Sequence, residues 1–396
     1  MRAPLLVLLL WFTGLGAAAQ FAKIAVPFGL VREAWPGAGE GIGWLLSIIS
    51  LVGAVLGVVA GDLVVRLGAK RMLVAGLLSG AAIALWQATV PPFAPMLAGR
   101  LLEGVSHLAI VVAAPTLIVR ISPPRLAGAA MTLWSTFFGV SFALVAWVIV
   151  PFLGQGGIAT LFLAHGLAML VLGLLALLVL PGPERAPAPA DARPGLLARH
   201  AQAYASPAIA APAAGWLFYT LTFVSLVALL PERLPPRHAA WATGSMPLVS
   251  VAVSLLAVPL LLRRLPGVAV IVLGFALAAA LVAVALPLDL GLSFAIALFA
   301  ALGLVQGASF AAVPELNATH EDRALAYGLM AQAGNTGNLL GTPLLLAVLG
   351  AHGAAGMHVT VAALYLLGIA IHLLLMHRRT RNPLPPDARG GRTRRG

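Results

Sequence analysis

The chain has 396 residues, of which 61% are hydrophobic and only 9% are charged. Soluble domains carry about 25% charged residues, so this composition excludes a soluble globular protein and predicts an integral membrane protein. The absence of Cys excludes disulfides and Cys-based chemistry, and the formal charge of +12 lies in short loops and a tail, where it sets topology and does not indicate nucleic-acid binding.

The first segment, MRAPLLVLLLWFTGLGAAAQ (residues 1–20), has the basic start, apolar run and Ala-rich end of a signal peptide. Its apolar run continues to residue 31, which gives about 28 residues, enough to cross a bilayer. If it were removed as a signal peptide, the distribution of Lys and Arg described below would fit the positive-inside rule no better. We therefore predict that it is retained as the first transmembrane helix.

Long apolar segments predict an all-α membrane protein with twelve transmembrane helices, arranged as two pseudo-symmetric six-helix bundles. The predicted helices cover residues 4–31, 42–63, 71–90, 93–119, 128–151, 157–180, 208–230, 239–262, 268–287, 290–313, 323–349 and 356–376.

Charge asymmetry orients these helices in the membrane. If the N-terminus is cytoplasmic, 19 of the 24 Lys and Arg residues fall on the cytoplasmic side, and only Arg32, Arg233 and Arg237 fall on the other. The remaining two, Lys23 and Arg100, lie inside helices. The positive-inside rule therefore predicts a multi-pass protein of the cell (inner) membrane with both termini in the cytoplasm.

A polar segment rich in Pro and Ala divides the chain in two. Residues 181–200, PGPERAPAPADARPGLLARH, are typical of a flexible linker. We predict an N-terminal six-helix bundle over residues 1–180, a cytoplasmic linker over 181–205, a C-terminal six-helix bundle over 206–377 and a basic cytoplasmic tail over 378–396. Six plus six helices are typical of two repeats related by an axis along the membrane normal.

The turn after the second predicted helix, GDLVVRLGAKR (residues 61–71), resembles the loop motif G-x-L-x-D-R-x-G-R-K/R of the major facilitator superfamily. Val65 and Ala69 replace the family's Asp and its first basic residue. The resemblance implies a cytoplasmic gate formed by Gly61, Asp62, Arg66, Gly68, Lys70 and Arg71. The alternative is a positive-inside turn in which glycine permits a tight bend.

The fourth predicted helix contains a second motif of this superfamily. GRLLEGVSH (residues 99–107) resembles R-x-x-Q/E-G-x-G, with Arg100, Glu103 and Gly104 in place and Ser106 at the last position. The stretches RLLEGVSHLAIVVAAPTLI and AQAGNTGNLLGTPLL are similar to the cyanate and nitroimidazole permease branch. That resemblance implies a small, often anionic, organic substrate.

In this superfamily helices 1, 4, 7 and 10 line a central cavity, and the resemblance implies the same arrangement here. The candidate substrate-binding residues on these helices are Gln20, Lys23, Arg100, Glu103, His107, Tyr219 and Gln306. Asn335 and Asn338 share a face of the eleventh helix and are two further candidates, with packing between helices as the alternative.

Lys23 and Arg100 are two cations at a similar predicted depth, about 12 Å below the outer surface at 1.5 Å per residue. One of them can pair with Glu103, and the other requires an anion or water, because intramembrane charges are costly and normally face a cavity. Three alternatives stay open: a purely structural Arg100–Glu103 pair, a Lys23 that snorkels to the surface, and a His107 that only packs between helices.

No catalytic set, metal-ligand spacing or cofactor motif stands in a suitable context, so we expect no enzyme activity, no metal and no cofactor. The sequence predicts a monomeric secondary transporter that moves a small organic anion by alternating access, with protons as a candidate coupling ion. Its expected partners are a small-molecule substrate and the lipid bilayer, not nucleic acid. The alternatives are a drug or metabolite exporter in which Glu103 recognises cations, and a non-transporting membrane sensor with the same fold.

Overall fold

The structure is a computed structural model of the chain, and it describes residues 2–57, 60–153, 156–182, 196–285 and 291–381. These residues are almost entirely helical. Helices satisfy all their backbone hydrogen bonds internally, as an apolar chain in a bilayer requires.

The first half of the chain contains α1 (Arg2–Ala25), α2 (Phe28–Ala34), η1 (Pro36–Ile42), α3 (Gly43–Ser47), η2 (Ile48–Ser50), α4 (Leu51–Leu56), α5 (Ala60–Leu67), α6 (Ala69–Gln87), α7 (Phe93–Ile121), α8 (Pro124–Ser135), α9 (Phe137–Leu144), η4 (Val145–Ile149), η5 (Val150–Phe152) and α10 (Gly157–Val179). The second half contains α11 (Leu196–Ala205), α12 (Pro207–Leu229), η7 (Pro231–Arg233), α13 (Pro236–Leu261), α14 (Gly267–Ala285), α15 (Gly291–Leu316) and α16 (His320–Arg381).

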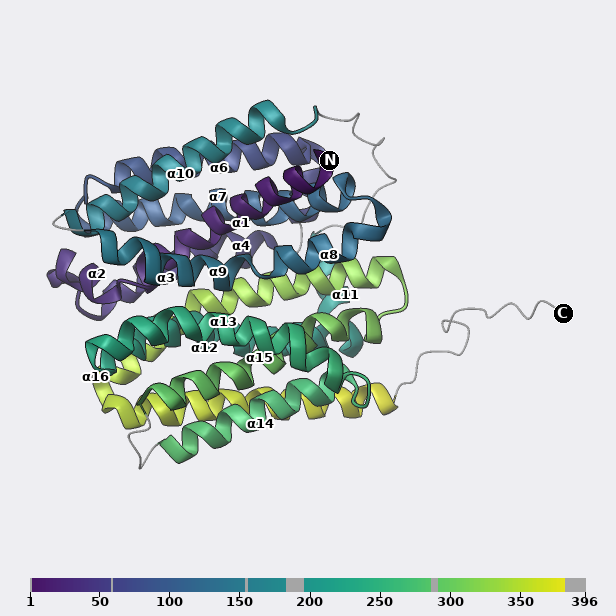
Figure 1. The fold of residues 1–396 in the computed structure, drawn as a ribbon. Helices are drawn as coiled ribbons and strands as arrows, with labels where there is room; N and C mark the ends of the chain where they lie inside the picture. The colour runs from purple at the N-terminus through teal and green to yellow at the C-terminus, as the bar shows by residue number, and fades with distance from the viewer. Residues whose placement is uncertain (1, 58–59, 154–155, 183–195, 286–290, 382–396) are drawn as a thin grey trace.

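The two halves lie side by side as two layers of helices (Figure 1). The purple-to-teal helices from α1 to α10 form one layer, and the green-to-yellow helices from α12 to α16 form the other. Helices of the two halves pack against one another: α3 and α4 contact α16, α9 contacts α13, and α1 contacts α12. The predicted all-α fold of two helical bundles is confirmed.

The last helix, α16, has 62 residues and cannot be a single membrane span. At 1.5 Å per residue it would be about 90 Å long, three times the thickness of the hydrocarbon core. Its backbone leaves the helical conformation at Gly353, where φ is 64° and ψ is −164°, and its light-green and yellow parts run in opposite directions (Figure 1). The described residues contain 11 helices long and apolar enough to cross a membrane, so the bend in α16 brings the crossing segments to the predicted twelve.

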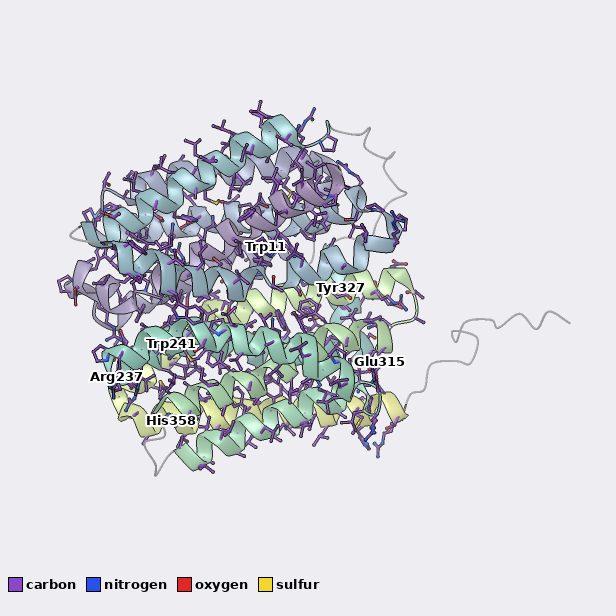
Figure 2. The ribbon with its side chains drawn as sticks, in the orientation of Figure 1. Trp11, Arg237, Trp241, Glu315, Tyr327 and His358 are labelled. Carbon is purple, nitrogen blue, oxygen red and sulfur yellow. The ribbon has the colours of Figure 1, made fainter. Side chains whose placement is uncertain are left out.

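Both ends of the described chain lie at the same end of the bundle, at the right of Figure 1. The turns and helix ends here carry the side chains of Arg66, Lys70, Arg71, Arg120, Arg125, Arg263, Arg264, Arg323, Arg378, Arg379 and Arg381. We call this the basic end, and the opposite end the distal end. The distal end carries Arg32, Arg233 and Arg237, of which Arg237 is labelled in Figure 2.

The first predicted helix, residues 4–31, is broken in the structure. α1 ends at Ala25, and α2 begins at Phe28 as a separate helix. Pro27 lies at the break because it has no backbone N–H with which to continue the helical hydrogen bonds. Lys23 therefore lies in the last turn of α1, where the helix dipole favours a positive charge.

Part of the linker that the sequence predicts to be flexible is helical. Residues 183–195 lie outside the described part of the chain, but Leu196–Ala205 form α11. The Tyr204 hydroxyl on α11 donates a hydrogen bond to Gln332 Oε1 at 3.2 Å. Gln332 Nε2 in turn donates to the Ala54 carbonyl oxygen of the other half at 3.0 Å. This segment is therefore ordered at the junction between α4 and α16.

Polar contacts fasten the two halves together at the distal end. Arg32 Nη2 and Glu232 Oε2 form a salt bridge at 3.2 Å, and the Trp147 indole donates to the Ala240 carbonyl oxygen at 3.0 Å. Trp241, which packs against Trp147, is labelled at this end of the interface in Figure 2. Toward the basic end, α5 and α8 pack against helices of their own half.

Candidate functional site

Helix α7 places Arg100 and Glu103 one turn apart on the same face, which points into the first half of the molecule. Gly104, beside them, lets α7 approach η2 closely, because a Cβ atom at this position would overlap the carbonyl oxygen of Ile49. The two charged side chains are thereby brought against the neighbouring helices, and both are completely buried.

The carboxylate of Glu103 is the centre of a buried polar cluster. Its Oε1 accepts a hydrogen bond from Lys23 Nζ of α1 at 2.6 Å. Its Oε2 accepts from Gln87 Nε2 of α6 at 3.1 Å and from Arg100 Nη1. We call Lys23, Gln87, Arg100, Glu103 and His165 the Glu103 cluster.

Lys23 uses all three donors of its ammonium group within the cluster. Besides Glu103, it contacts Gln87 Oε1 at 2.7 Å and His165 Nδ1 at 3.3 Å. His165 Nε2 lies 3.0 Å from the Gly16 carbonyl oxygen, which can only accept, so Nε2 carries the proton and Nδ1 is free to accept from Lys23. This hydrogen-bond pattern matches a neutral His165 beside a charged Lys23.

Arg100 is the member of the cluster whose hydrogen bonds are incomplete. Its Nη1 binds Glu103, and its Nε donates to the Leu45 carbonyl oxygen of α3 at 2.7 Å. Its Nη2 is buried and has no hydrogen-bond partner among the described residues. Two cations share one carboxylate, so the cluster carries one excess positive charge and a spare donor.

Sequence reasoning identified part of this cluster. It selected Lys23, Arg100 and Glu103, and the structure brings the three together. The expectation that Glu103 pairs with only one cation is wrong, since one cation binds each carboxylate oxygen. Lys23 does not snorkel, because its side chain is completely buried.

Sequence reasoning missed Gln87 and His165. Gln87 is the last residue of an apolar helix and resembles an ordinary interface residue. His165 is a single His in α10, and its sequence context indicates no particular role. The available signal is weak: each is an isolated polar side chain at the end of, or within, a long apolar stretch.

Gln20 and His107 form a second, adjoining network. Gln20 Nε2 donates to Ser106 Oγ at 2.9 Å, and the Ser106 hydroxyl donates to the Gly76 carbonyl oxygen at 2.6 Å. His107 Nδ1 lies 3.1 Å from the Ala17 carbonyl oxygen and 3.2 Å from Gln20 Oε1. Both partners are acceptors, so Nδ1 carries the proton and His107 ties α7 to α1.

The candidates of the second half lie in separate contacts. The Tyr219 hydroxyl donates to Gln306 Oε1 at 3.1 Å, which joins α12 to α15. Asn335 Nδ2 donates to the Ala331 carbonyl oxygen of its own helix at 2.8 Å, and its side chain packs on Gly53 across the interface. Asn338 Oδ1 is buried without a partner among the residues that the structure describes. The nine predicted residues are therefore divided among the Glu103 cluster, the adjoining Gln20–His107 network, the Tyr219–Gln306 pair and the separate side chains of Asn335 and Asn338.

Aromatic rings connect two of these groups across the interface between the halves. The His107 ring packs edge-on against Phe21 at 5.0 Å between centroids, and Phe21 lies 5.9 Å from Phe138 of α9. Phe138 contacts Phe223 of α12 at 6.4 Å, and Phe223 contacts Tyr219 at 4.9 Å. We call Phe21, Phe138, Phe223 and Tyr219 the aromatic seam. It fills the middle of the interface with apolar rings.

The candidate gate lies at the basic end, in α5 and the start of α6. Gly68 has φ of 83°, a conformation that glycine adopts and other residues resist. Lys70 Nζ donates to the Leu180 carbonyl oxygen at 2.6 Å, within its own half, and Arg66 is exposed. Gly61 and Asp62 belong to α5, but the Asp62 side chain lies outside the described residues. The gating role stays a prediction.

Comparison with known proteins places this arrangement in a family. The sequence profile of the Major Facilitator Superfamily matches residues 6–316. The fold is similar to the crystal structure of a bacterial homolog of the human lysosomal transporter Spinster, in an inward-facing and unoccupied conformation. The TM-score is 0.69 at 14% sequence identity, over 97% of this chain and 99% of that chain.

A search of curated proteins returned no match, and the resemblance to the cyanate and nitroimidazole permease branch stays a prediction. The profile match covers most of the chain and agrees with the loop and helix motifs. The chain belongs to the major facilitator superfamily and is a membrane transporter.

Proposed function

We propose that the protein is a secondary transporter of a small organic anion, and that Arg100 binds the anionic group. One observation carries this proposal: Arg100 Nη2 is buried with no partner among the described residues, in a cluster where two cations share one carboxylate. A buried donor without an acceptor is costly, and an anion would supply the missing acceptor.

The excess charge favours an anion over a neutral solute. Unit charges about 4 Å apart interact by about 4 kcal/mol at the effective dielectric constant near 20 that suits protein sites. The planar guanidinium of Arg100 can bind a carboxylate through two parallel hydrogen bonds, which Lys23 cannot do. We therefore expect carboxylates to be preferred among small anions.

Glu103 offers a route for proton coupling. A carboxylate that is already held by Lys23 and Arg100 competes with an incoming anion for the same donors. Protonation of Glu103 would remove this competition and leave two positive charges for one anion. We propose that substrate and proton move together, because each one favours the binding of the other.

The contacts between the halves support an alternating-access cycle. The Arg32–Glu232 salt bridge and the Trp147–Ala240 hydrogen bond close the distal end, and the aromatic seam fills the middle of the interface. We propose that the basic end faces the cytoplasm, as the positive-inside rule requires, and that both termini lie there. Rocking of the halves would then expose the site to one side at a time.

The geometry argues against the alternative of a cation exporter. Recognition of a cationic drug would need a carboxylate whose oxygens are free. Both oxygens of Glu103 are occupied by cations of the protein itself, so a cationic substrate would have to displace a buried Lys or Arg.

Transport into liposomes tests the proposal. We would reconstitute the purified protein and measure uptake of radiolabelled acetate, lactate and benzoate, each with and without an inward proton gradient. We expect uptake of at least one anion, stimulated by the gradient, and loss of uptake in Arg100→Met. Arg125→Gln removes an exposed Arg at the basic end and should transport normally. Undiminished uptake by folded Arg100→Met would refute the role of Arg100.

A further inference from the structure

Two hollows open at the basic end, one in each half of the molecule. The first, with a volume of about 450 Å³, is lined by Lys70, Arg71, Val74, Ala75 and Leu177. It lies between the start of α6 and the end of α10. The second, of about 490 Å³, is lined by Leu260, Leu261, Arg263, Arg264 and Leu265 in the turn from α13 to α14. We call them the α6 groove and the α13 groove.

The two grooves lie beside corresponding turns of the two halves. The α6 groove lies at the start of the third crossing segment, just after the turn from the second, and the α13 groove lies at the end of the eighth crossing segment and in the turn to the ninth. Each groove combines two consecutive basic residues with three apolar ones, and neither lining contains an acidic residue. The positive-inside rule accounts for basic residues in a turn, but it does not require an apolar hollow beside them in both halves.

Each groove continues onto exposed apolar side chains of the same helix. Leu177 is 48% exposed, and on the same helix Leu174 and Val171 are 46% and 55% exposed. Leu260 is 58% exposed, and Leu256, one turn deeper on α13, is 70% exposed. When the two basic residues bind the head group of a ligand, these exposed side chains form an apolar surface along which its apolar chain can lie toward the bilayer.

The side chains that carry the charge are available to a ligand. Arg71, Arg263 and Arg264 are exposed, and none of them forms a salt bridge with another described residue. Lys70 Nζ is held at the rim of the α6 groove by the Leu180 carbonyl oxygen. Amphipathic shape and positive charge together match a phospholipid with an anionic head group.

We infer that the α6 groove and the α13 groove each bind one anionic phospholipid of the membrane leaflet at the basic end. The head-group phosphate contacts the basic pair, and one acyl chain lies along the exposed leucines. Each basic residue near an anionic lipid contributes roughly a fivefold gain in affinity. We therefore expect about a 30-fold preference of each groove for an anionic over a zwitterionic lipid, since both basic residues contribute.

Native mass spectrometry of the purified full-length protein tests this inference directly. The probes are phosphatidylglycerol and phosphatidylcholine with identical acyl chains, titrated in turn. We expect two tightly bound phosphatidylglycerol molecules for the wild type. Lys70→Gln/Arg71→Gln and Arg263→Gln/Arg264→Gln should each retain one, and the combination of all four changes should retain none.

A charge-matched control separates grooves from general surface charge. Arg66→Gln/Arg125→Gln also removes two exposed basic residues at this end, but neither residue lines a groove. This variant should still bind two phosphatidylglycerol molecules. If the Lys70 change disturbs folding, Arg71→Gln alone serves for the α6 groove and should weaken binding about fivefold.

Three results would overturn the inference. Equal binding of phosphatidylcholine would show that the basic pairs do not select the head group. An equal loss of lipid in the control variant would assign the binding to diffuse surface charge. Displacement of the lipid by soluble glycerol phosphate would show that the sites bind phosphate without the acyl chain.

Discussion

Replacing Glu103 by Gln keeps the size of the side chain but removes the only carboxylate of the Glu103 cluster. Oε1 accepts from Lys23, and Oε2 accepts from Arg100 and Gln87. An amide group has one accepting oxygen and one NH₂ that only donates. In either orientation the NH₂ of the introduced amide would therefore point at another donor, and two buried cations would lose their counter-ion.

The expected cost follows from the burial of these groups. Removing one partner of a buried ion pair costs about 3–5 kcal/mol, because it leaves an uncompensated charge. Lys23, Arg100 and Glu103 are all completely buried, and here one substitution removes the partner of two cations. We therefore expect the free energy of unfolding to fall by an amount at the upper end of that range or beyond it. This is a large part of a typical free energy of unfolding of about 5–15 kcal/mol.

Thermal unfolding in detergent, followed by Trp fluorescence and by elution volume, measures this loss. The matched control is Lys23→Met/Glu103→Gln, which leaves one cation and lets the amide oxygen face Arg100. It should be clearly more stable than Glu103→Gln alone, although it carries one more change. A Glu103→Gln variant as stable as the wild type, or a double variant no better than the single one, would refute the ion-pair reasoning.

Three further predictions address the backbone, the interface and the topology. Gly68→Ala and Gly68→Val should both lower the free energy of unfolding by about 1–3 kcal/mol, because a φ of 83° is unfavourable for either residue. Nothing lies within 4 Å of the new Cβ, so the cost comes from the backbone and not from a steric overlap. Unchanged stability in thermal unfolding would contradict this. Gly57→Ala should lower the free energy of unfolding by about 1–3 kcal/mol, since its Cβ would lie 2.8 Å from the Gln332 backbone nitrogen. The control Gly128→Ala, whose Cβ would meet open space, should be neutral or slightly stabilising. Equal effects of the two changes would disprove the close packing of α4 on α16. A reporter that is active only outside the cytoplasm should be inactive when fused to the C-terminus, and activity there would reverse the proposed orientation.

The fold could be predicted because the membrane restricts the choices. Apolar segments of sufficient length must be helices, and the charge asymmetry sets their direction. The break at Pro27 and the helix α11 are the main differences. Pro27 carries a readable signal, since proline ends a helix, but α11 contacts Gln332 of α16, which is distant in sequence.

The candidate site could be predicted only in part. Arg100 and Glu103 are close in sequence, and charges are rare enough in this chain for Lys23 to stand out. Gln87 and His165 come from α6 and α10, and their positions depend on how these helices pack against α1 and α7. The pairing of both cations with one carboxylate likewise follows from tertiary geometry, which one-dimensional spacing does not contain.

The central claim is that Arg100 binds the anionic group of the substrate, and Arg100→Lys tests it most directly. This change keeps the charge but removes the planar donor pair and Nη2. The measurement is the KM for proton-driven uptake of the transported anion into liposomes, with Arg125→Lys as the matched control at an exposed position. Loss of about 1.4 kcal/mol or more of binding free energy predicts a KM at least about tenfold higher for Arg100→Lys and an unchanged KM for Arg125→Lys. A folded Arg100→Lys variant with the wild-type KM would contradict the account.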